Sequence, residues 1–216
     1  DRYGIVDAIV SIGAIPYQDF YQARGYSHYK CSPGVDDLRL REHFLDRIYD
    51  TLVDEERFRE TDAYIGEIAS SLDPRVYSSR EFMEVLGSRI DDQNSILFNA
   101  HRYGVPIFVP ALNDSSIGIG LTGAHVRVKE EKGEHMRLDP IRDNWELTQI
   151  KIKAKTTGLL MIGGGSPKNF AQDTVVCAEI LGKDADMHKY AIQITVADVR
   201  DGACSSSTLK EANSWG

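Results

Sequence analysis

The sequence predicts an α/β fold in which helices cover both faces of a parallel β-sheet. Short apolar, β-branched segments alternate with longer segments whose apolar residues recur at helical spacing. Three of the four strand candidates show hardly any polar alternation, which is typical of parallel strands buried on both faces. With 216 residues, of which 42% are hydrophobic, the chain can form one domain with a substantial core.

Four segments are predicted to be strands: residues 5–12, 105–112, 158–162 and 190–196. Most of them end in glycine or in small polar residues. Because open α/β sheets bind ligands at the carboxyl ends of their strands, we expect the functional site at that edge of the sheet.

Helices are predicted between the strands. Residues 38–55 place five apolar side chains at helical spacing, namely Leu38, Phe44, Leu45, Ile48 and Leu52. Capping boxes at Ser78 with Glu81 and at Asp143 with Glu146 are predicted to open two further helices.

Two later segments complete the prediction. Ser166, followed by Pro167, is predicted to begin a helix that continues through residues 169–181. The charge-rich residues 127–137 are predicted to form a solvated loop. No internal repeat or low-complexity tract interrupts the alternation.

The composition excludes several classes of protein. With 25 basic and 33 acidic residues, the net charge of −8 argues against a nucleic-acid groove. No apolar run approaches the ~20 residues of a membrane span. Three widely spaced cysteines indicate a reducing compartment, so we expect a cytoplasmic protein. The six histidines show no metal-ligand spacing, and no Ser-His-Asp or Gly-x-Ser-x-Gly pattern stands out, so neither a metal site nor a hydrolase is expected.

Three consecutive glycines follow the third predicted strand. Gly163, Gly164 and Gly165 lead from an apolar strand into the start of a helix. Glycine permits positive φ and close approach of a ligand, and a helix start favours an anion such as a pyrophosphate. The pattern is neither G-x-G-x-x-G nor a Walker loop, so a tight turn without a ligand explains it equally well.

An acidic residue follows the second predicted strand. Asp114 stands where acidic groups of dinucleotide sites accept hydrogen bonds from ribose hydroxyls. An Asx turn formed by Asn113 and Asp114 is the alternative interpretation.

The last 16 residues combine a loop of small residues with Glu211 and Trp215. Because these two residues are four apart, they would share one face of a helix. A carboxylate beside an indole ring can bind an ammonium group. A surface glutamate beside a packing tryptophan is the alternative.

In this order, the motifs resemble the deoxyhypusine synthase family. The segments that carry the resemblance are residues 6–13, 110–118, 159–170 and 211–216. The similarity extends over the whole chain and is dense in its second half. It implies a single NAD-binding domain over residues 1–216, with a Rossmann-like sheet, that is incomplete at both ends.

The resemblance also implies an activity. Enzymes of this family use NAD to transfer an aminobutyl group from spermidine to an amine, through an imine on a lysine, and release diaminopropane. The acceptor is a lysine of a translation-factor precursor, or putrescine in homospermidine synthases. A homotetramer with sites shared across a dimer interface is implied as well, and no nucleic acid or membrane partner is expected.

By position, the resemblance assigns residues to three roles. NAD contacts are expected from Gly13, Asp114, Gly163, Gly164, Gly165, Val196 and Ala197. Contacts to the polyamine are expected from Ser116, Gly202, Glu211, Ser214 and Trp215. Asn169 and Gln18 stand at catalytic positions, and the nucleophilic lysine is expected directly after Gly216, outside this sequence.

Five positions depart from the family pattern. Tyr17 and Gln18 replace a pair of glutamates, Ile119 an acidic spermidine ligand, Asn169 the active-site histidine and Cys204 a tunnel aspartate. Amides can orient an amine but cannot take its proton at neutral pH, and isoleucine cannot hold an ammonium group. Two alternatives therefore stay open: a homospermidine-synthase-type enzyme that uses putrescine or another small amine, and a relative that binds NAD without transfer activity.

Overall fold

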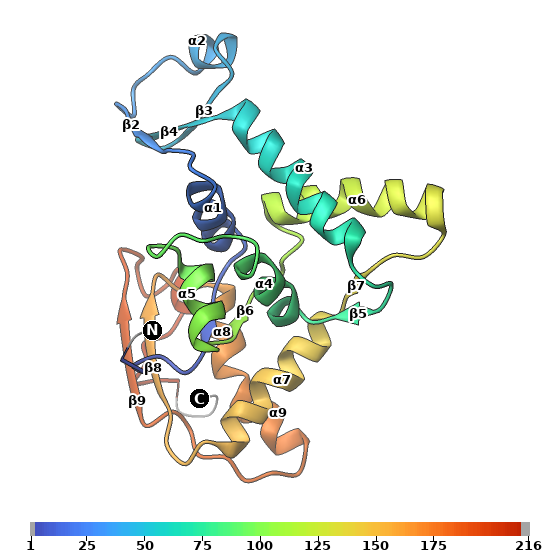
Figure 1. Cartoon of the computed structure of the whole chain (residues 1–216). Coiled ribbons are helices and arrows are strands. Elements are labelled where there is room, and N and C mark those ends of the chain that lie inside the picture. Colours follow the sequence, from blue (N-terminus) through green and yellow to red (C-terminus); the bar gives the residue numbers. More distant parts are fainter. Residues whose placement is uncertain (1–2, 213–216) are drawn as a thin grey trace.

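The computed structural model describes residues 3–212 and shows a mixed α/β protein, in which parallel strand pairs lie beside packed helices (Figure 1). The α/β class with parallel pairing is therefore confirmed. The helices are α1 (Ala14–Ala23), α2 (Asp37–Glu42), α3 (Glu55–Ser71), α4 (Ser79–Gly87), α5 (Ile96–Tyr103), α6 (Ser116–Lys132), α7 (Pro140–Lys153), α8 (Ser166–Gln172), α9 (Thr174–Ile180) and a short 3-10 helix η1 (Gly202–Cys204).

The strands form small sheets rather than one continuous sheet. They are β1 (Ile9–Val10), β2 (Tyr29–Lys30), β3 (Leu45–Ile48), β4 (Thr51–Asp54), β5 (Val76–Tyr77), β6 (Ile107–Phe108), β7 (Arg137–Leu138), β8 (Gly158–Ile162) and β9 (Tyr190–Ile194). Three pairs are parallel, β1 with β6, β5 with β7, and β8 with β9, whereas β2, β4 and β3 form an antiparallel sheet. All four predicted strands are present, three of them shorter than expected.

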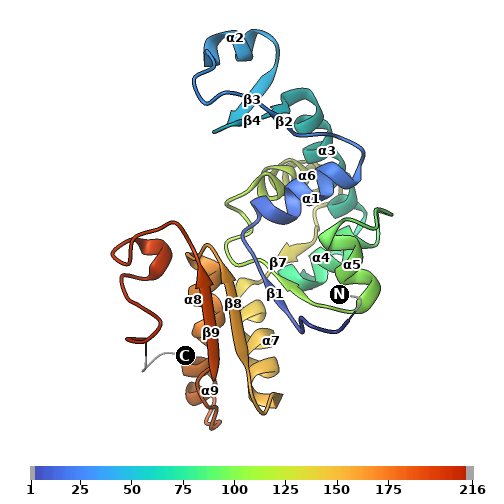
Figure 2. The same ribbon diagram turned by 90° about the vertical axis from the view of Figure 1, so that its left-hand side faces the viewer.

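The β8–β9 pair is covered on one face only within the described residues. Helices α7, α8 and α9 lie on that face (Figure 2). The register places Leu160 opposite Ile192 and Ile162 opposite Ile194, so that these four side chains share the other face. Each of them is more than 60% exposed. The expected cover of helices on both faces is thus seen on one.

The predicted helix over residues 38–55 is wrong. Helix α2 ends at Glu42, and β3 and β4 then form a hairpin (Figure 1). Phe44 and Tyr49 both have a φ of 56°, a left-handed conformation that ends the helix before β3 and turns the chain after it. Apolar residues spaced three or four apart in so short a segment fit a twisted hairpin as well as a helix.

Of the two predicted capping boxes, one is confirmed and the other is wrong. The box at Ser78 and Glu81 is confirmed, since the Ser78 hydroxyl accepts from the Glu81 N–H and the Glu81 carboxylate accepts from the Ser78 N–H. The box at Asp143 is wrong, because α7 begins earlier and Asp139 caps it. The Asp143 carboxylate instead caps the start of α4 from α7.

Two further boundaries differ from expectation. Gly165 rather than Ser166 is the N-cap of α8, and the expected helix through residues 169–181 is divided at Asp173 into α8 and α9. Residues 127–137 were expected to form a loop, but α6 continues to Lys132. Alternating charges on one exposed helix face give the same composition as a loop.

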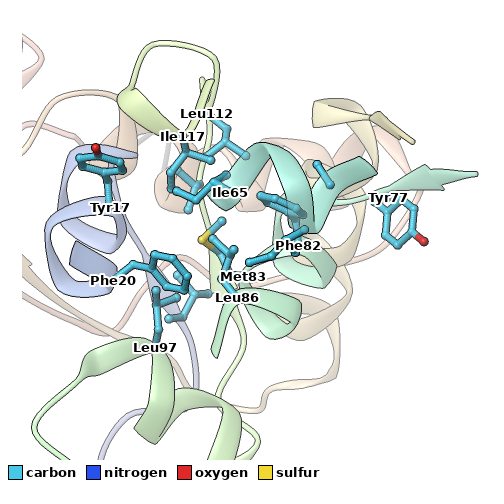
Figure 3. Packing of buried hydrophobic residues seen from close by; sticks show 14 of the residues in the cluster. Tyr17, Phe20, Ile65, Tyr77, Phe82, Met83, Leu86, Leu97, Leu112 and Ile117 are labelled. Carbon is cyan, nitrogen blue, oxygen red and sulfur yellow. The ribbon is translucent and has the colours of Figure 1, made fainter. Parts of the chain in front are cut away.

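A hydrophobic core joins α1, α3, α4, α5 and α6 (Figure 3). Phe20 from α1, Ile65 from α3 and Ile117 from α6 are fully buried in it. In Figure 3 the side chains of Met83 and Leu86 on α4 point toward the same interior. This core fixes the loops that follow β1 and β6, because α1 and α6 begin directly after those loops.

Substitution of Asp143 by alanine is expected to destabilise the fold strongly. Asp143 is 2% exposed, and its carboxylate accepts hydrogen bonds from the N–H groups of Ser79 at 3.0 Å and Arg80 at 3.3 Å. Burial raises the pKa of this carboxyl. Without it, two N–H groups at the start of α4 lose their partner, so the free energy of unfolding should fall by about 2–4 kcal/mol. Urea denaturation, with Asp184→Ala as an exposed control, measures it, and an equal change in both variants would contradict the assignment.

His188 is expected to make the fold acid-sensitive. Burial, with the charge of Lys151, lowers the pKa of its imidazole from 6.5 to about 4. Between these two values the unfolded chain binds a proton that the folded chain does not, so stability falls as the pH falls through this window. The expected loss between pH 7 and pH 5 is about 1–2 kcal/mol, allowing for partial solvent screening. His188→Gln should remove this loss and the exposed His43→Gln should not, as thermal unfolding at both pH values would reveal.

Candidate functional site

Two clusters of loops follow the carboxyl ends of the parallel strands. The first joins the loops after β1 and β6. Gly13 is the N-cap of α1, and a Cβ atom at this position would overlap the side chain of Ser115. Gly13 therefore lies against the loop that carries Asp114 and Ser116. The structure thus brings three of the predicted site residues together.

Asp114 is exposed at the tip of this loop. Within residues 3–212, neither its carboxylate nor the Asn113 amide makes a hydrogen bond, so the structure does not favour the Asx-turn interpretation. Ser115 closes the loop instead, because its hydroxyl donates to the Leu112 carbonyl at 2.6 Å and accepts from the Gly118 N–H at 3.4 Å. The Asp114 carboxylate is therefore available to a ligand.

The second cluster joins the triple-glycine loop after β8 to the residues after β9. The Gly163 N–H donates to the Ile194 carbonyl at 2.8 Å, and the Gly165 N–H donates to the Ala203 carbonyl at 3.0 Å. A Cβ atom at Gly164 would overlap that same Ala203 oxygen. Only glycine allows the loop to lie this close to the η1 backbone.

The other two glycines leave the backbone open. Gly163 has a φ of 87° and Gly165 a φ of 70°, and among the described residues a Cβ atom built on either would meet no atom within 4 Å. Side chains are therefore disfavoured at these positions by the positive φ and not by a steric contact. The described residues thus leave these two Cβ positions open to a ligand.

Gln193 is a site residue that the sequence analysis missed. Its amide nitrogen donates to the Gly163 carbonyl at 2.8 Å and to the Ala203 carbonyl at 3.4 Å. Gln193 thereby ties the triple-glycine loop to η1 from beneath. An amide side chain between two isoleucines of the strand segment 190–196 was the feature that could have identified it.

Lys168, Asn169 and Ser205 form a second link between these loops. The Lys168 ammonium donates to the Ser205 hydroxyl at 3.0 Å and to the Cys204 carbonyl at 3.4 Å. The Ser205 hydroxyl donates to the Asn169 Oδ1 atom. Among these residues and Cys204, the sequence analysis had singled out Asn169 and Cys204. Lys168 lies within the quoted glycine motif, but nothing in its spacing marked it.

The two clusters belong to neighbouring layers. Helix α8, which begins at the triple-glycine loop, packs against β1, which leads into the Gly13 loop. Figure 2 shows β1 beside the β8–β9 pair and its helices. The two loop clusters thus follow the carboxyl ends of four strands, β1, β6, β8 and β9.

The remaining predicted NAD and polyamine residues follow β9. Val196 is fully exposed and Ala197 is half-buried, close to the end of the strand. Gly202 begins η1. These three residues lie on the segment that leads from β9 to the Ala203 contact with the triple-glycine loop.

Glu211 lies in a turn. The prediction that Glu211 stands on a helix face is therefore wrong. Its carboxylate accepts from the Thr208 N–H at 2.8 Å and from the Thr208 hydroxyl at 2.7 Å. These hydrogen bonds lower the pKa of Glu211, which keeps it anionic. Ser214 and Trp215 lie outside the described residues.

The departures from the family pattern have distinct environments. Tyr17 is 2% exposed in the core and donates to the Phe58 carbonyl at 3.1 Å, and burial and the Asp62 carboxylate raise its pKa. Gln18 is half-buried on α1, whereas Ile119 is 63% exposed on α6. Cys204 is buried in η1. Tyr17 is therefore a packing residue.

Two absences concern the part of the chain that the structure describes. Across residues 3–212, no group of three or more His, Cys, Asp and Glu side chains is arranged to hold a metal ion. No helix in the same residues is long and apolar enough to cross a membrane.

The three cysteines, Cys31, Cys177 and Cys204, are free thiols.

The fold is similar to that of proteins whose structures are solved. A crystal structure of a candidate deoxyhypusine synthase from Entamoeba histolytica superposes with a TM-score of 0.59, over 91% of this chain and 62% of that chain. The sequence identity is 18%, so this likeness concerns the fold alone.

The sequence matches a family more directly. The family model described as "Deoxyhypusine synthase" matches residues 2–216. Proteins named "Deoxyhypusine synthase-like protein" are 58% identical in Coxiella burnetii and 56% in Caulobacter vibrioides, over all of this chain and 62% and 60% of theirs. A Methanosarcina mazei protein named "Probable deoxyhypusine synthase 2" is 44% identical, again over all of this chain and 62% of that protein. This chain thus spans about three fifths of these relatives, and it belongs to the deoxyhypusine synthase family.

Proposed function

We propose that this protein is an NAD-dependent transferase that moves an aminobutyl group from spermidine to an amine acceptor, the acceptor being a lysine of a translation-factor precursor. Family membership gives the reaction class. The observation that carries the proposal is the open backbone of Gly163 and Gly165 beside η1. Residues 1–216 act in it as one NAD-binding unit.

The residues at the strand ends fit a dinucleotide. Gly163 and Gly165 offer backbone in empty space, and Gly164 holds the loop against Ala203. Asp114 has a carboxylate without an internal partner in the described residues, which suits ribose hydroxyls. Gly13, Val196 and Ala197 complete the proposed set. NAD, when bound, supplies the acceptor that takes up and later returns a hydride.

The polyamine is proposed to bind beside the residues after β9. Glu211 is exposed and anionic, so it can attract an ammonium group. Ser116, Gly202, Ser214 and Trp215 are the other residues proposed to contact the polyamine. Water exclusion is required, because an imine would hydrolyse.

Asn169 and Gln18 are the proposed catalytic positions, and the nucleophile is a lysine directly after Gly216. Both amides can orient an amine by hydrogen bonds, but neither can accept its proton at neutral pH. Peptide sequencing of the full-length protein tests the nucleophile. A residue other than lysine after Gly216 would contradict this part of the proposal.

The second candidate function is the transfer of the aminobutyl group to a small amine. Ile119 is exposed where the family has an acidic spermidine ligand, and Cys204 is uncharged, so fewer charges are available for a second ammonium group. This favours putrescine as acceptor, in a homospermidine-synthase-type reaction. A homotetramer and a cytoplasmic location stay predictions, the latter supported by the three free thiols.

The test incubates the full-length protein with NAD and, in turn, spermidine, putrescine and agmatine, with and without a translation-factor precursor. Amine products are identified by mass spectrometry. Diaminopropane with modified precursor supports the first candidate, and homospermidine supports the second. NAD binding with no product from any amine would contradict both and leave a relative that binds NAD without transfer activity.

A further inference from the structure

A buried lysine stands behind the position where the family has its active-site histidine. Lys168 is 2% exposed, and its ammonium donates to the Ser205 hydroxyl at 3.0 Å. The Ser205 hydroxyl in turn donates to Oδ1 of Asn169. These contacts form a directed chain from the Lys168 ammonium to the side-chain amide of Asn169.

The direction of the chain follows from the chemistry of its groups. An ammonium group has three donors and no acceptor, so the Ser205 oxygen must accept from Lys168. The one hydroxyl proton of Ser205 then points to Oδ1 of Asn169. This leaves the Asn169 amide nitrogen, which makes no hydrogen bond within residues 3–212, as the group that can meet a ligand.

Asn169 itself lies beside the triple-glycine loop. Its backbone N–H donates to the Gly165 carbonyl at 3.2 Å, in the first turn of α8. Burial lowers the pKa of the Lys168 ammonium. With Oδ1 of Asn169 held by the Ser205 hydroxyl, position 169 presents hydrogen-bond donors.

We propose that Lys168, acting through Ser205, is a positioning residue that turns the amide nitrogen of Asn169 toward the amine substrate, so that this position takes an uncharged substrate nitrogen and rejects an ammonium. The inference rests on the proposed function, because it assumes an amine at this site. It assigns Asn169 the role of selecting the protonation state of the substrate, in place of removing a proton.

Titration calorimetry of spermidine into the full-length protein with bound NADH tests this selection, because NADH cannot oxidise the amine and the proton counted is then the one released on binding. At pH 8 free alkyl amines are protonated, so binding of an uncharged nitrogen releases about one proton. The binding enthalpy in phosphate and in Tris then differs by the ionisation enthalpy of the buffer. Asn169→Asp, which offers acceptors of nearly the same shape, should abolish the release.

The positioning role is tested by Lys168→Met, with the exposed Lys183→Met as its control. Lys168→Met should abolish most of the proton release, since the Asn169 amide can then turn its oxygen to an ammonium. Lys168→Arg should restore part of the release. Ser205→Gly, at a residue with a φ of 57° that suits glycine, should act like Lys168→Met even if that variant folds poorly.

The outcomes separate this inference from the proposed function. Spermidine binding without proton release by the unmodified protein, or equal release by Asn169→Asp, would overturn the inference and leave the proposed function intact. Failure of the unmodified protein to bind any amine would overturn both.

Discussion

Gly164→Ala is expected to weaken NAD binding by the full-length protein at least about 100-fold. A Cβ atom at this position would overlap the carbonyl oxygen of Ala203, which is backbone and cannot move as a flexible side chain can. The triple-glycine loop must then leave η1 and lose the Gly165 hydrogen bond to the same carbonyl. About 3 kcal/mol of lost preorganised binding corresponds to this factor. Fluorescence titration with NAD measures it.

Gly123→Ala is the matched control for that substitution. Gly123 lies within α6, and a Cβ atom there would meet no atom within 4 Å. Alanine should leave the NAD affinity unchanged and raise the stability of the helix by about 0.5–1 kcal/mol. If Gly164→Ala bound NAD within twofold of the unmodified protein while circular dichroism showed it folded, the triple-glycine loop would have no part in the cofactor site.

Asp114→Asn is expected to weaken NAD binding about 10- to 100-fold. The proposed contact is a pair of charge-assisted hydrogen bonds from ribose hydroxyls, each of which is stronger than its neutral counterpart. The amide keeps the shape of the side chain but loses the charge and one acceptor. The free protein should be equally stable, because within the described residues the carboxylate has no hydrogen-bond partner to lose.

The neighbouring Asn113→Ala serves as the control for Asp114. Asn113 is exposed on the same loop, and its amide likewise makes no hydrogen bond within the described residues. Its removal should leave the affinity within about twofold. Equal losses in the two variants would indicate a general effect on the loop, and no loss in Asp114→Asn would place the ribose elsewhere.

The sequence predicted those parts of the fold that local pattern determines. The strand over residues 158–162 has the bounds that were expected, because five apolar residues before a triple glycine allow few other structures. The capping box at Ser78 was predictable because both of its hydrogen bonds are local. The β3–β4 hairpin was missed, since the positive φ angles of Phe44 and Tyr49 are not typical of those residue types.

The residues of the candidate site likewise fall into those that the sequence could predict and those that it could not. Gly163, Gly164, Gly165 and Asp114 directly follow predicted strands, so their places beyond the carboxyl ends of strands could be expected from the fold class. Gln193 and the pairing of Lys168 with Ser205 could not, because they depend on contacts between residues up to 37 positions apart.

The cover of the β8–β9 pair was predicted only in part from the sequence. Apolar runs predicted cover on both faces, but within residues 3–212 Leu160, Ile162, Ile192 and Ile194 remain exposed on one of them. The apolar composition of a strand indicates that the strand is suited to burial. Which segment provides the cover is a tertiary property that the run of apolar residues does not encode.

We propose that one site holds NAD and an aminobutyl donor at the ends of these strands. The most direct measurement mixes the full-length protein and NAD with spermidine, in the absence of any acceptor, and follows the absorbance and fluorescence of reduced nicotinamide on the enzyme. The expected result is a reduced-nicotinamide signal that requires spermidine and is lost in Gly164→Ala. NAD bound tightly by the unmodified protein, with no reduction by spermidine or any smaller amine, would contradict it.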